Sequence, residues 1–154
     1  FWGSNFCEYE GFSAGENVSV SICYTCGMTD VSIGAGGYLY LSQNCSVANL
    51  DLATGASAWI CNSCLLSGVS LGSDAELTAS YFTELEDVRI GVGGSVLLGY
   101  SQCRMSGVTV DSGGYLSLAS GASALAVTSA AGAVIEADEG AYIEYSTTEE
   151  ESNE

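Results

Sequence analysis

The chain contains no proline, no lysine and no histidine, and its only basic side chains are Arg89 and Arg104. Against these two arginines stand 19 acidic residues, which give a formal net charge of −17 at pH 7. Nucleic acids and anionic lipid surfaces are bound mainly through lysine and arginine. The composition therefore argues against nucleic-acid binding and against adhesion to an anionic membrane.

Long apolar runs are also missing, because no stretch approaches the ~18 consecutive apolar residues of a membrane-spanning helix. The 154 residues do include 20 glycines and much serine, alanine, valine and leucine. This composition is typical of strands and turns rather than of helices. We therefore expect one elongated all-β domain without a membrane span.

A period of 19 residues runs through the chain. It is marked by four cysteines, Cys7, Cys26, Cys45 and Cys64. Thr83 takes the next step, and Cys103 falls one residue late, which places a single inserted residue in the unit that begins at Asp87. Fixed self-similarity of this kind is typical of arrays in which each unit stacks on the next.

Each unit carries three pairs of apolar residues that alternate with polar or small ones. The units begin at Gly11, Asp30, Asn49, Gly68, Asp87, Gly107 and Ala126. Counted from these starts, the apolar pairs occupy positions two and four, ten and twelve, and sixteen and eighteen, as short strands with one buried face require. Glycines such as Gly36 and Gly93 lie between the first two pairs, where a tight turn can use positive φ.

Three short strands per 19 residues predict one coil of a β-solenoid. We therefore expect an all-β, single-domain solenoid, a right-handed β-helix of seven to eight coils. Residues 11–144 are expected to form seven repeats, residues 1–10 a partial N-terminal coil and assembly segment, and residues 145–154 an acidic tail. Like residues then stack at ~4.8 Å, and the core becomes a set of ladders. No single coil can bury its own inner face, so several are needed for stability.

Seven cysteines in a chain of this size favour an oxidising, extracellular or cell-surface setting, with metal binding as the alternative. All seven are candidates for the ladder or for disulfides: Cys7, Cys23, Cys26, Cys45, Cys61, Cys64 and Cys103. Two CxxC motifs, Cys23 to Cys26 and Cys61 to Cys64, would also fit a soft metal or a redox site, although the period explains half of each motif. We expect disulfides within these motifs, while the stacking distance also permits pairs between adjacent coils.

Outward-pointing aromatic residues offer a binding surface. Tyr38, Tyr40, Trp59 and Tyr115 occupy positions nine and eleven, where they can stack along one face. Exposed aromatic rings favour contact with sugars or with a partner protein. The alternative is that they only stabilise neighbouring coils through cross-strand pairs.

Two segments carry a resemblance to a known family. They read Val-Ser-Ile-Gly-Ala-Gly-Gly-Tyr-Leu-Tyr-Leu over residues 31–41 and Val-Thr-Val-Asp-Ser-Gly-Gly-Tyr-Leu-Ser-Leu over residues 108–118. These segments resemble the repeats of bacterial autotransporter passengers of the AIDA adhesin type, and the similarity extends over about residues 12–144. The resemblance implies a surface-displayed right-handed solenoid used in adhesion, with glycans or a host surface as partners. The cysteines depart from that pattern, because such passengers largely lack them.

An enzyme on the same architecture is the alternative from another class. Polysaccharide-cleaving β-helices need paired carboxylates on one surface, yet Asp30 and Asp87 lie three units apart. The densest mid-chain acidic group, Glu84, Glu86 and Asp87, fits a solvated corner or a weak calcium site. We therefore expect no catalytic residue, no metal and no cofactor.

The period also predicts assembly. Carried to both ends, it places Phe1 and Glu154 at position ten, so that one chain stops where the next would start. The expected interface comprises Phe1, Trp2 and Phe6 at one end and Tyr145 at the other. Open solenoid ends invite strand addition, and a head-to-tail contact that does not close generates a filament. The predicted function is a non-catalytic extracellular structural protein whose first partner is a second copy of itself.

Overall fold

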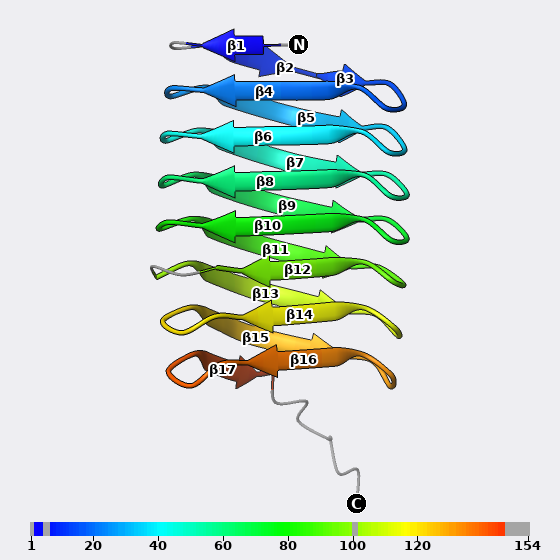
Figure 1. Ribbon diagram of the computed structural model, residues 1–154, viewed down its shortest axis with the longest axis vertical. Coiled ribbons are helices and arrows are strands. Elements are labelled where there is room, and N and C mark those ends of the chain that lie inside the picture. Colours follow the sequence, from blue (N-terminus) through cyan, green and yellow to red (C-terminus); the bar gives the residue numbers. More distant parts are fainter. Residues whose placement is uncertain (1, 5–6, 100–101, 147–154) are drawn as a thin grey trace, which may run out of the picture.

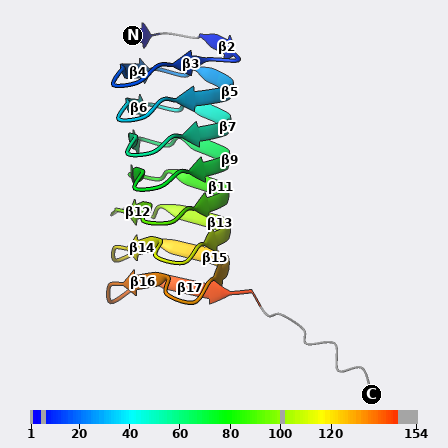
Figure 2. The same cartoon turned by 90° about the vertical axis from the view of Figure 1, so that its right-hand side faces the viewer.

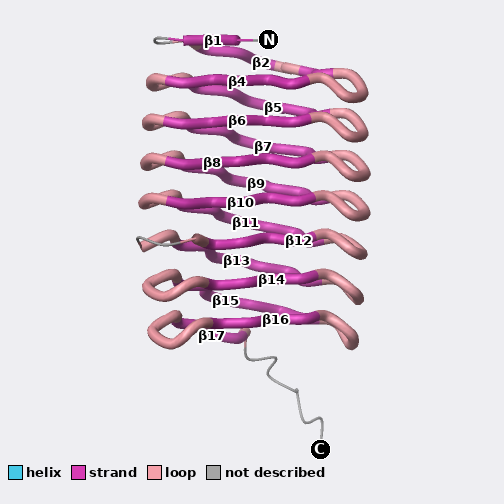
Figure 3. Tube along the Cα trace, viewed as in Figure 1, coloured by secondary structure: helices cyan, strands magenta, loops and turns pink. Residues whose placement is uncertain are grey.

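A computed structural model of the chain describes residues 2–4, 7–99 and 102–146 (Figure 1). The strands facing the viewer in Figure 1 run to the left and those behind run to the right while the chain descends from its N-terminus, which is a right-handed winding. Figure 3 shows only strands and loops along this path. The predicted right-handed β-solenoid is confirmed. None of the described segments is a helix that is long and apolar enough to cross a membrane.

One face of the solenoid is a parallel sheet of eight strands. In spatial order its strands are β1 (Trp2–Ser4), β4 (Ser19–Cys23), β6 (Tyr38–Ser42), β8 (Ser57–Cys61), β10 (Glu76–Ser80), β12 (Ser95–Leu98), β14 (Tyr115–Leu118) and β16 (Val134–Ala137). They hold positions nine to thirteen of successive coils. Neighbouring strands pair residue for residue, as with Leu77 opposite Ala58 and Val96.

The remaining strands form a second parallel sheet, seen edge-on beside the first in Figure 2. They are β2 (Glu8–Glu10), β3 (Ser13–Ala14), β5 (Gly27–Ile33), β7 (Ser46–Leu52), β9 (Leu65–Leu71), β11 (Glu84–Ile90), β13 (Arg104–Val110), β15 (Ser123–Ser129) and β17 (Tyr142–Tyr145). From β5 to β15, each strand joins two of the three segments that the sequence predicts. Position one lies between them with a left-handed backbone, as at Asn49 (φ 59°) and Asp87 (φ 52°), and it bends the strand without ending it.

The core is the set of inward ladders. Position twelve, for example, contributes Ile22, Leu41, Ile60, Ala79, Leu98 and Leu118, all of them buried. Inward and outward residues alternate within each strand because successive side chains of a strand point to opposite faces. The solenoid therefore needs no second layer, since the two sheets enclose a single apolar interior.

The inserted residue lies in one corner of the solenoid. Leu98 pairs with Ala79 at an offset of 19 residues on one side and with Leu118 at an offset of 20 on the other. Arg104 pairs with Glu84 at an offset of 20 and with Ser123 at an offset of 19. The extra residue thus falls between Leu98 and Arg104, and both sheets keep their register.

The register changes at the C-terminal end. Tyr142 lies opposite Ser123 as the period predicts, but Tyr145 lies opposite Val127, one residue earlier than the repeat requires. Strand β17 has no left-handed residue among those recorded with positive φ, so it runs straight where the other strands bend. Continuation of the repeat with Glu154 at position ten is therefore not supported, and residues 147–154 lie outside the described residues.

Candidate functional site

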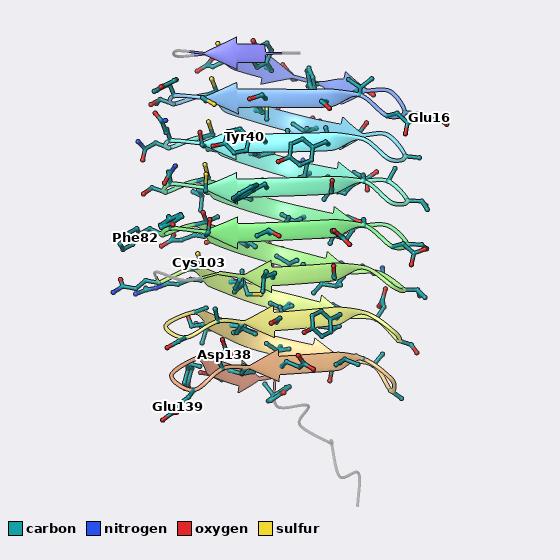
Figure 4. The ribbon with its side chains drawn as sticks, in the orientation of Figure 1. Glu16, Tyr40, Phe82, Cys103, Asp138 and Glu139 are labelled. Atoms are coloured by element: carbon teal, nitrogen blue, oxygen red, sulfur yellow. The ribbon has the colours of Figure 1, made fainter. Side chains whose placement is uncertain are left out.

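Three of the four predicted aromatic residues, Tyr38, Tyr40 and Trp59, lie on the neighbouring strands β6 and β8 of the eight-stranded sheet. Figure 4 labels Tyr40 among them. The rings of Tyr40 and Trp59 meet edge to face, with centroids 6.3 Å apart and planes at 89°. Tyr38 lies two residues before Tyr40 on β6, and Trp59 is 50% exposed. The contact between Tyr40 and Trp59 is a cross-strand pair, and it leaves half of the Trp59 side chain exposed.

Tyr115 does not belong to this group. It lies on β14, which is separated from β8 by β10 and β12. Its hydroxyl donates a 2.6 Å hydrogen bond to a carboxylate oxygen of Glu136 on the next strand. This bond raises the pKa of Tyr115 because the carboxylate favours the protonated phenol. The aromatic face is therefore a cluster of three residues with one outlier.

A shallow depression of about 310 Å³ lies between the cluster and Tyr115. Its outward-facing residues are mostly polar, with Leu97 as the apolar exception: Glu76, Thr78, Ser95, Leu97, Tyr115 and Ser117. Hydroxyl groups beside aromatic rings can orient a flat polar ligand. A larger groove of about 610 Å³ follows the second sheet, and it is lined near the N-terminus by Glu8 and Glu10 and further along by Leu65.

An exposed aromatic pair at one corner escaped the sequence analysis. Tyr81 and Phe82 have φ of 55° and 63°, and more than half of each side chain is exposed (Figure 4 labels Phe82). Bulky residues are rare in this left-handed region. In the next coil toward the N-terminus the same corner holds Asn62 and Ser63, whose short polar side chains suit this conformation better. That contrast between coils was the signal available in the sequence.

The acidic residues that the structure describes do not assemble into a cation site. In the described segments, no group of three or more carboxylates or thiols is placed to hold a metal ion. Glu84 and Glu86 both point outward from β11. Arg89 forms an exposed ion pair with Asp111, with 3.0 Å between Nε and the carboxylate oxygen.

The ladder cysteines point inward. The side chains of Cys26, Cys45, Cys64 and Cys103 are buried and that of Cys7 is half-buried. Inward thiols donate to corner carbonyl groups, as from Cys45 to the oxygen of Ser42 at 3.1 Å. The predicted inward placement of this column agrees with the structure.

The disulfides expected within the two CxxC motifs are not formed, since all seven cysteines are thiols. In each motif two left-handed corner residues separate the cysteines. The first cysteine is half-buried in one motif (Cys23) and buried in the other (Cys61), and the second cysteine of each motif is part of the core. The thiol of Cys26 donates to the backbone oxygen of Cys23 at 3.6 Å, and that of Cys64 to the oxygen of Cys61 at 3.1 Å. Cys61 instead contacts Tyr40, with 3.7 Å between its sulfur and the phenol oxygen.

The two ends of the solenoid differ in how much of the predicted interface can be seen. Backbone pairing of Trp2 with Ser21 agrees with the predicted register, while Phe1 and Phe6 lie outside the described residues, as does the side chain of Trp2. At the other end Tyr145 is 54% exposed. The inward-pointing Ile135 and Ile143 are only partly buried, because no described strand lies beyond β16 and β17.

The chain was compared with protein-family models, with curated proteins and with solved structures, and none of these comparisons finds a match. The fold defines the class of protein, a parallel β-solenoid built from 19-residue coils. Function is argued from the surfaces described above.

Proposed function

We propose that this chain is a non-catalytic structural protein of the extracellular space or cell surface, and that its rods join end to end with further copies. The observation that supports this most is the last described coil, whose inner side chains no described strand covers. Ile135 and Ile143 hold inward positions that are buried in the preceding coils, yet here they remain partly exposed. Burying such side chains stabilises an interface by roughly 25 cal/mol per Å² of apolar area.

The shape of the coil favours a second copy as the cover. Every coil repeats one outline, so the surface that best fits the last coil is the first coil of another rod. Strands β16 and β17 also present backbone groups that no described strand pairs with, and parallel strand addition would satisfy them. A contact of this kind is head to tail and does not close, so it extends into a filament.

Charge should control this assembly. The N-terminal coil carries Glu8 and Glu10, and the C-terminal coil carries Glu136, Asp138 and Glu144. Like charges would meet across the junction, and salt screens them over a Debye length of ~10 Å at 0.1 M. We therefore expect filaments to lengthen as ionic strength rises.

The test compares two double variants of the last coil. Ile135→Asp with Ile143→Asp places carboxylates in the proposed junction and should abolish filaments seen by electron microscopy and by light scattering. Val134→Asp with Tyr142→Asp makes the same change in charge on outward-facing neighbours in the same strands. Equal filament lengths in both variants would refute the junction, as would a monomeric wild-type protein at every salt concentration.

Adhesion to a neutral glycan is the second candidate function, in line with the resemblance to AIDA-type passengers. The accessible indole of Trp59, together with the hydroxyl groups of Ser57 and Thr78 on the same sheet, supports it. Glu76 and the net charge of −17 disfavour an anionic glycan. Trp59→Ala should remove binding on a glycan array, whereas Tyr81→Ala, which also deletes an exposed aromatic ring, should not.

A further inference from the structure

Four inward cysteines form one uninterrupted column in the N-terminal half of the solenoid. They are Cys7, Cys26, Cys45 and Cys64. Backbone hydrogen bonds join neighbouring members of the column. The residue after a cysteine donates its N–H to the carbonyl oxygen of the cysteine one coil earlier, at 2.9 Å from Gly27 to Cys7 and 3.0 Å from Leu65 to Cys45. This bonding fixes neighbouring members at the strand spacing of ~4.8 Å, which lies within the Cα separation that a disulfide spans.

The column has a defined end. Thr83 occupies the next step, and its hydroxyl donates a 2.7 Å bond to the oxygen of Ser80. This bond is the counterpart of the one that Cys45 donates to Ser42. A hydroxyl group cannot take part in disulfide exchange, so Cys103 on the far side of Thr83 is chemically separated from the other four.

The column also has an accessible beginning. In the described part of the chain, Cys7 and Cys26 both line a cavity of about 500 Å³. Cys7 is half-buried, whereas Cys45 and Cys64 are each only 1% exposed. Cys26 is likewise only 1% exposed, so in the folded protein a small oxidant can meet Cys7 but none of the three deeper thiols directly.

The thiols differ in acidity along the column. The side-chain interaction with Cys64 lowers the pKa of Cys45, and the interaction with Cys45 together with burial raises the pKa of Cys64. Burial also raises the pKa of Cys26. Because the thiolate is the attacking species in disulfide exchange, these shifts favour the attack by Cys45 and slow the attacks by Cys26 and Cys64.

We propose that the column from Cys7 to Cys64 is a thiol–disulfide relay that carries oxidation from the accessible N-terminal coil into the sealed core and leaves two disulfides between adjacent coils. The oxidant is a small-molecule disulfide such as oxidised glutathione. The end product pairs Cys7 with Cys26 and Cys45 with Cys64.

Each step conserves atoms and electrons. The Cys7 thiolate attacks one sulfur of the oxidant and releases one small thiolate; Cys26 then attacks the sulfur of Cys7 and releases the second. Cys45 attacks Cys26 and frees the Cys7 thiolate, and Cys64 attacks Cys45 and frees Cys26. Cys7 and Cys26 are then oxidised again by a second molecule of oxidant. In total, four protein thiols and two small disulfides give two protein disulfides and four small thiols.

The stacked geometry suits these exchanges. Thiolate attack requires the incoming sulfur to approach opposite the sulfur that leaves, and members of one column approach each other along a common line. The resulting cross-links would tie four successive coils together in two pairs, in the half of the solenoid that contains the column. The motif pairs Cys23 with Cys26 and Cys61 with Cys64 lack this arrangement, because both members of each pair belong to the same coil and do not stack in one column.

The sequence allows direct mapping of the products. Cleavage before aspartate yields residues 1–29 with Cys7, Cys23 and Cys26, residues 30–50 with Cys45 alone, and residues 51–73 with Cys61 and Cys64. Reduced protein is incubated with oxidised glutathione, alkylated at intervals, cleaved and analysed by mass spectrometry. We expect residues 30–50 to become linked to residues 51–73 through Cys64, after a disulfide first appears within residues 1–29. Cys103, in residues 87–110, should stay alkylated.

The decisive variant is Cys7→Thr, which Thr83 shows to be compatible with this position of the coil. It should slow formation of the Cys45–Cys64 link by at least about tenfold, while Cys103→Thr should leave the rate unchanged. An unchanged rate in Cys7→Thr would overturn the relay, and so would links confined to the CxxC motifs. If Cys7→Thr alters the circular dichroism spectrum, the order of appearance in wild type decides: a Cys45–Cys64 link that forms before any oxidation of Cys7 refutes the proposal.

Discussion

Replacing Gly107 with alanine should destabilise the solenoid by an amount that can be worked out from the bend at position one. Gly107 has φ of 63°, and a Cβ atom there would lie 2.7 Å from the Oδ1 atom of Asp87 in the coil before. The left-handed backbone costs a non-glycine residue about 1–2 kcal/mol. Relieving the contact with a movable carboxylate adds about 1 kcal/mol. Alanine also restricts the unfolded chain more than glycine does, which offsets about 0.5–1 kcal/mol. We expect the free energy of unfolding to fall by about 1–2.5 kcal/mol.

The chain contains the reciprocal experiment. Ala126 holds the same position with φ of 52°, so the free energy of unfolding of the wild-type protein is already lowered by a left-handed alanine. Ala126→Gly recovers about 1–2 kcal/mol and loses about 0.5–1 kcal/mol to the greater freedom of glycine in the unfolded chain. A net stabilisation of roughly 0.5–1 kcal/mol should follow.

Urea unfolding followed by circular dichroism measures both changes as shifts in midpoint at constant slope. Adding Asp87→Gly removes the carboxylate, so Gly107→Ala should cost about 1 kcal/mol less in that background. An equal cost in both backgrounds would refute the contact, and a loss of stability in Ala126→Gly would refute the argument from backbone strain. A changed slope would show that coils unfold separately, as repeat arrays can.

Three further predictions concern the core and the surface. Thr83→Cys replaces a 2.7 Å hydroxyl bond with a weaker thiol donor, and it should cost about 1 kcal/mol in thermal unfolding under reducing conditions. Leu98→Ala removes a fully buried side chain and should cost about 2–5 kcal/mol by urea unfolding, whereas Leu97→Ala on the outward face of the same strand should cost under about 0.5 kcal/mol. Because Glu136 raises the pKa of Tyr115, the contact between them is intact below the pKa of an unfolded tyrosine and is lost as pH rises through the folded value. Absorbance titration should therefore lose one of its late phenol transitions, above the pH at which an unfolded tyrosine ionises, in Tyr115→Phe, and an unchanged curve would contradict the assignment.

The inside and outside of every coil followed from the sequence because a period of two within strands and a period of 19 between coils leave few choices. Cys45 and Leu98 were placed correctly on these grounds alone. The joining of two predicted strands was not foreseen. A bend made by one left-handed residue does not interrupt the apolar pattern. The only sign of it in the sequence is that position one is glycine, asparagine or aspartate in most coils.

The surface was less predictable than the core. Tyr115 was predicted to lie with Tyr40 and Trp59 because all three occupy outward positions of the same strand in their coils. Such positions place the side chains on one face of the sheet, but they do not bring residues of distant coils into contact. The motif disulfides were wrong because sequence spacing does not show that a corner turns Cys23 outward and Cys26 inward. The register change at Tyr145 also went unforeseen. The alternation of apolar and polar residues weakens in the final coil, and too few inward apolar side chains remain there to fix the strand register.

The extra residue between Leu98 and Arg104 shows where this architecture can vary in length. Both sheets continue across it in register, so the ladders on either side do not detect the change. Corners are therefore the places where duplicated coils can diverge by insertion without a cost to their neighbours. An epitope or a fluorescent label grafted between these two residues would report on individual rods from the side, and leave both stacking surfaces available.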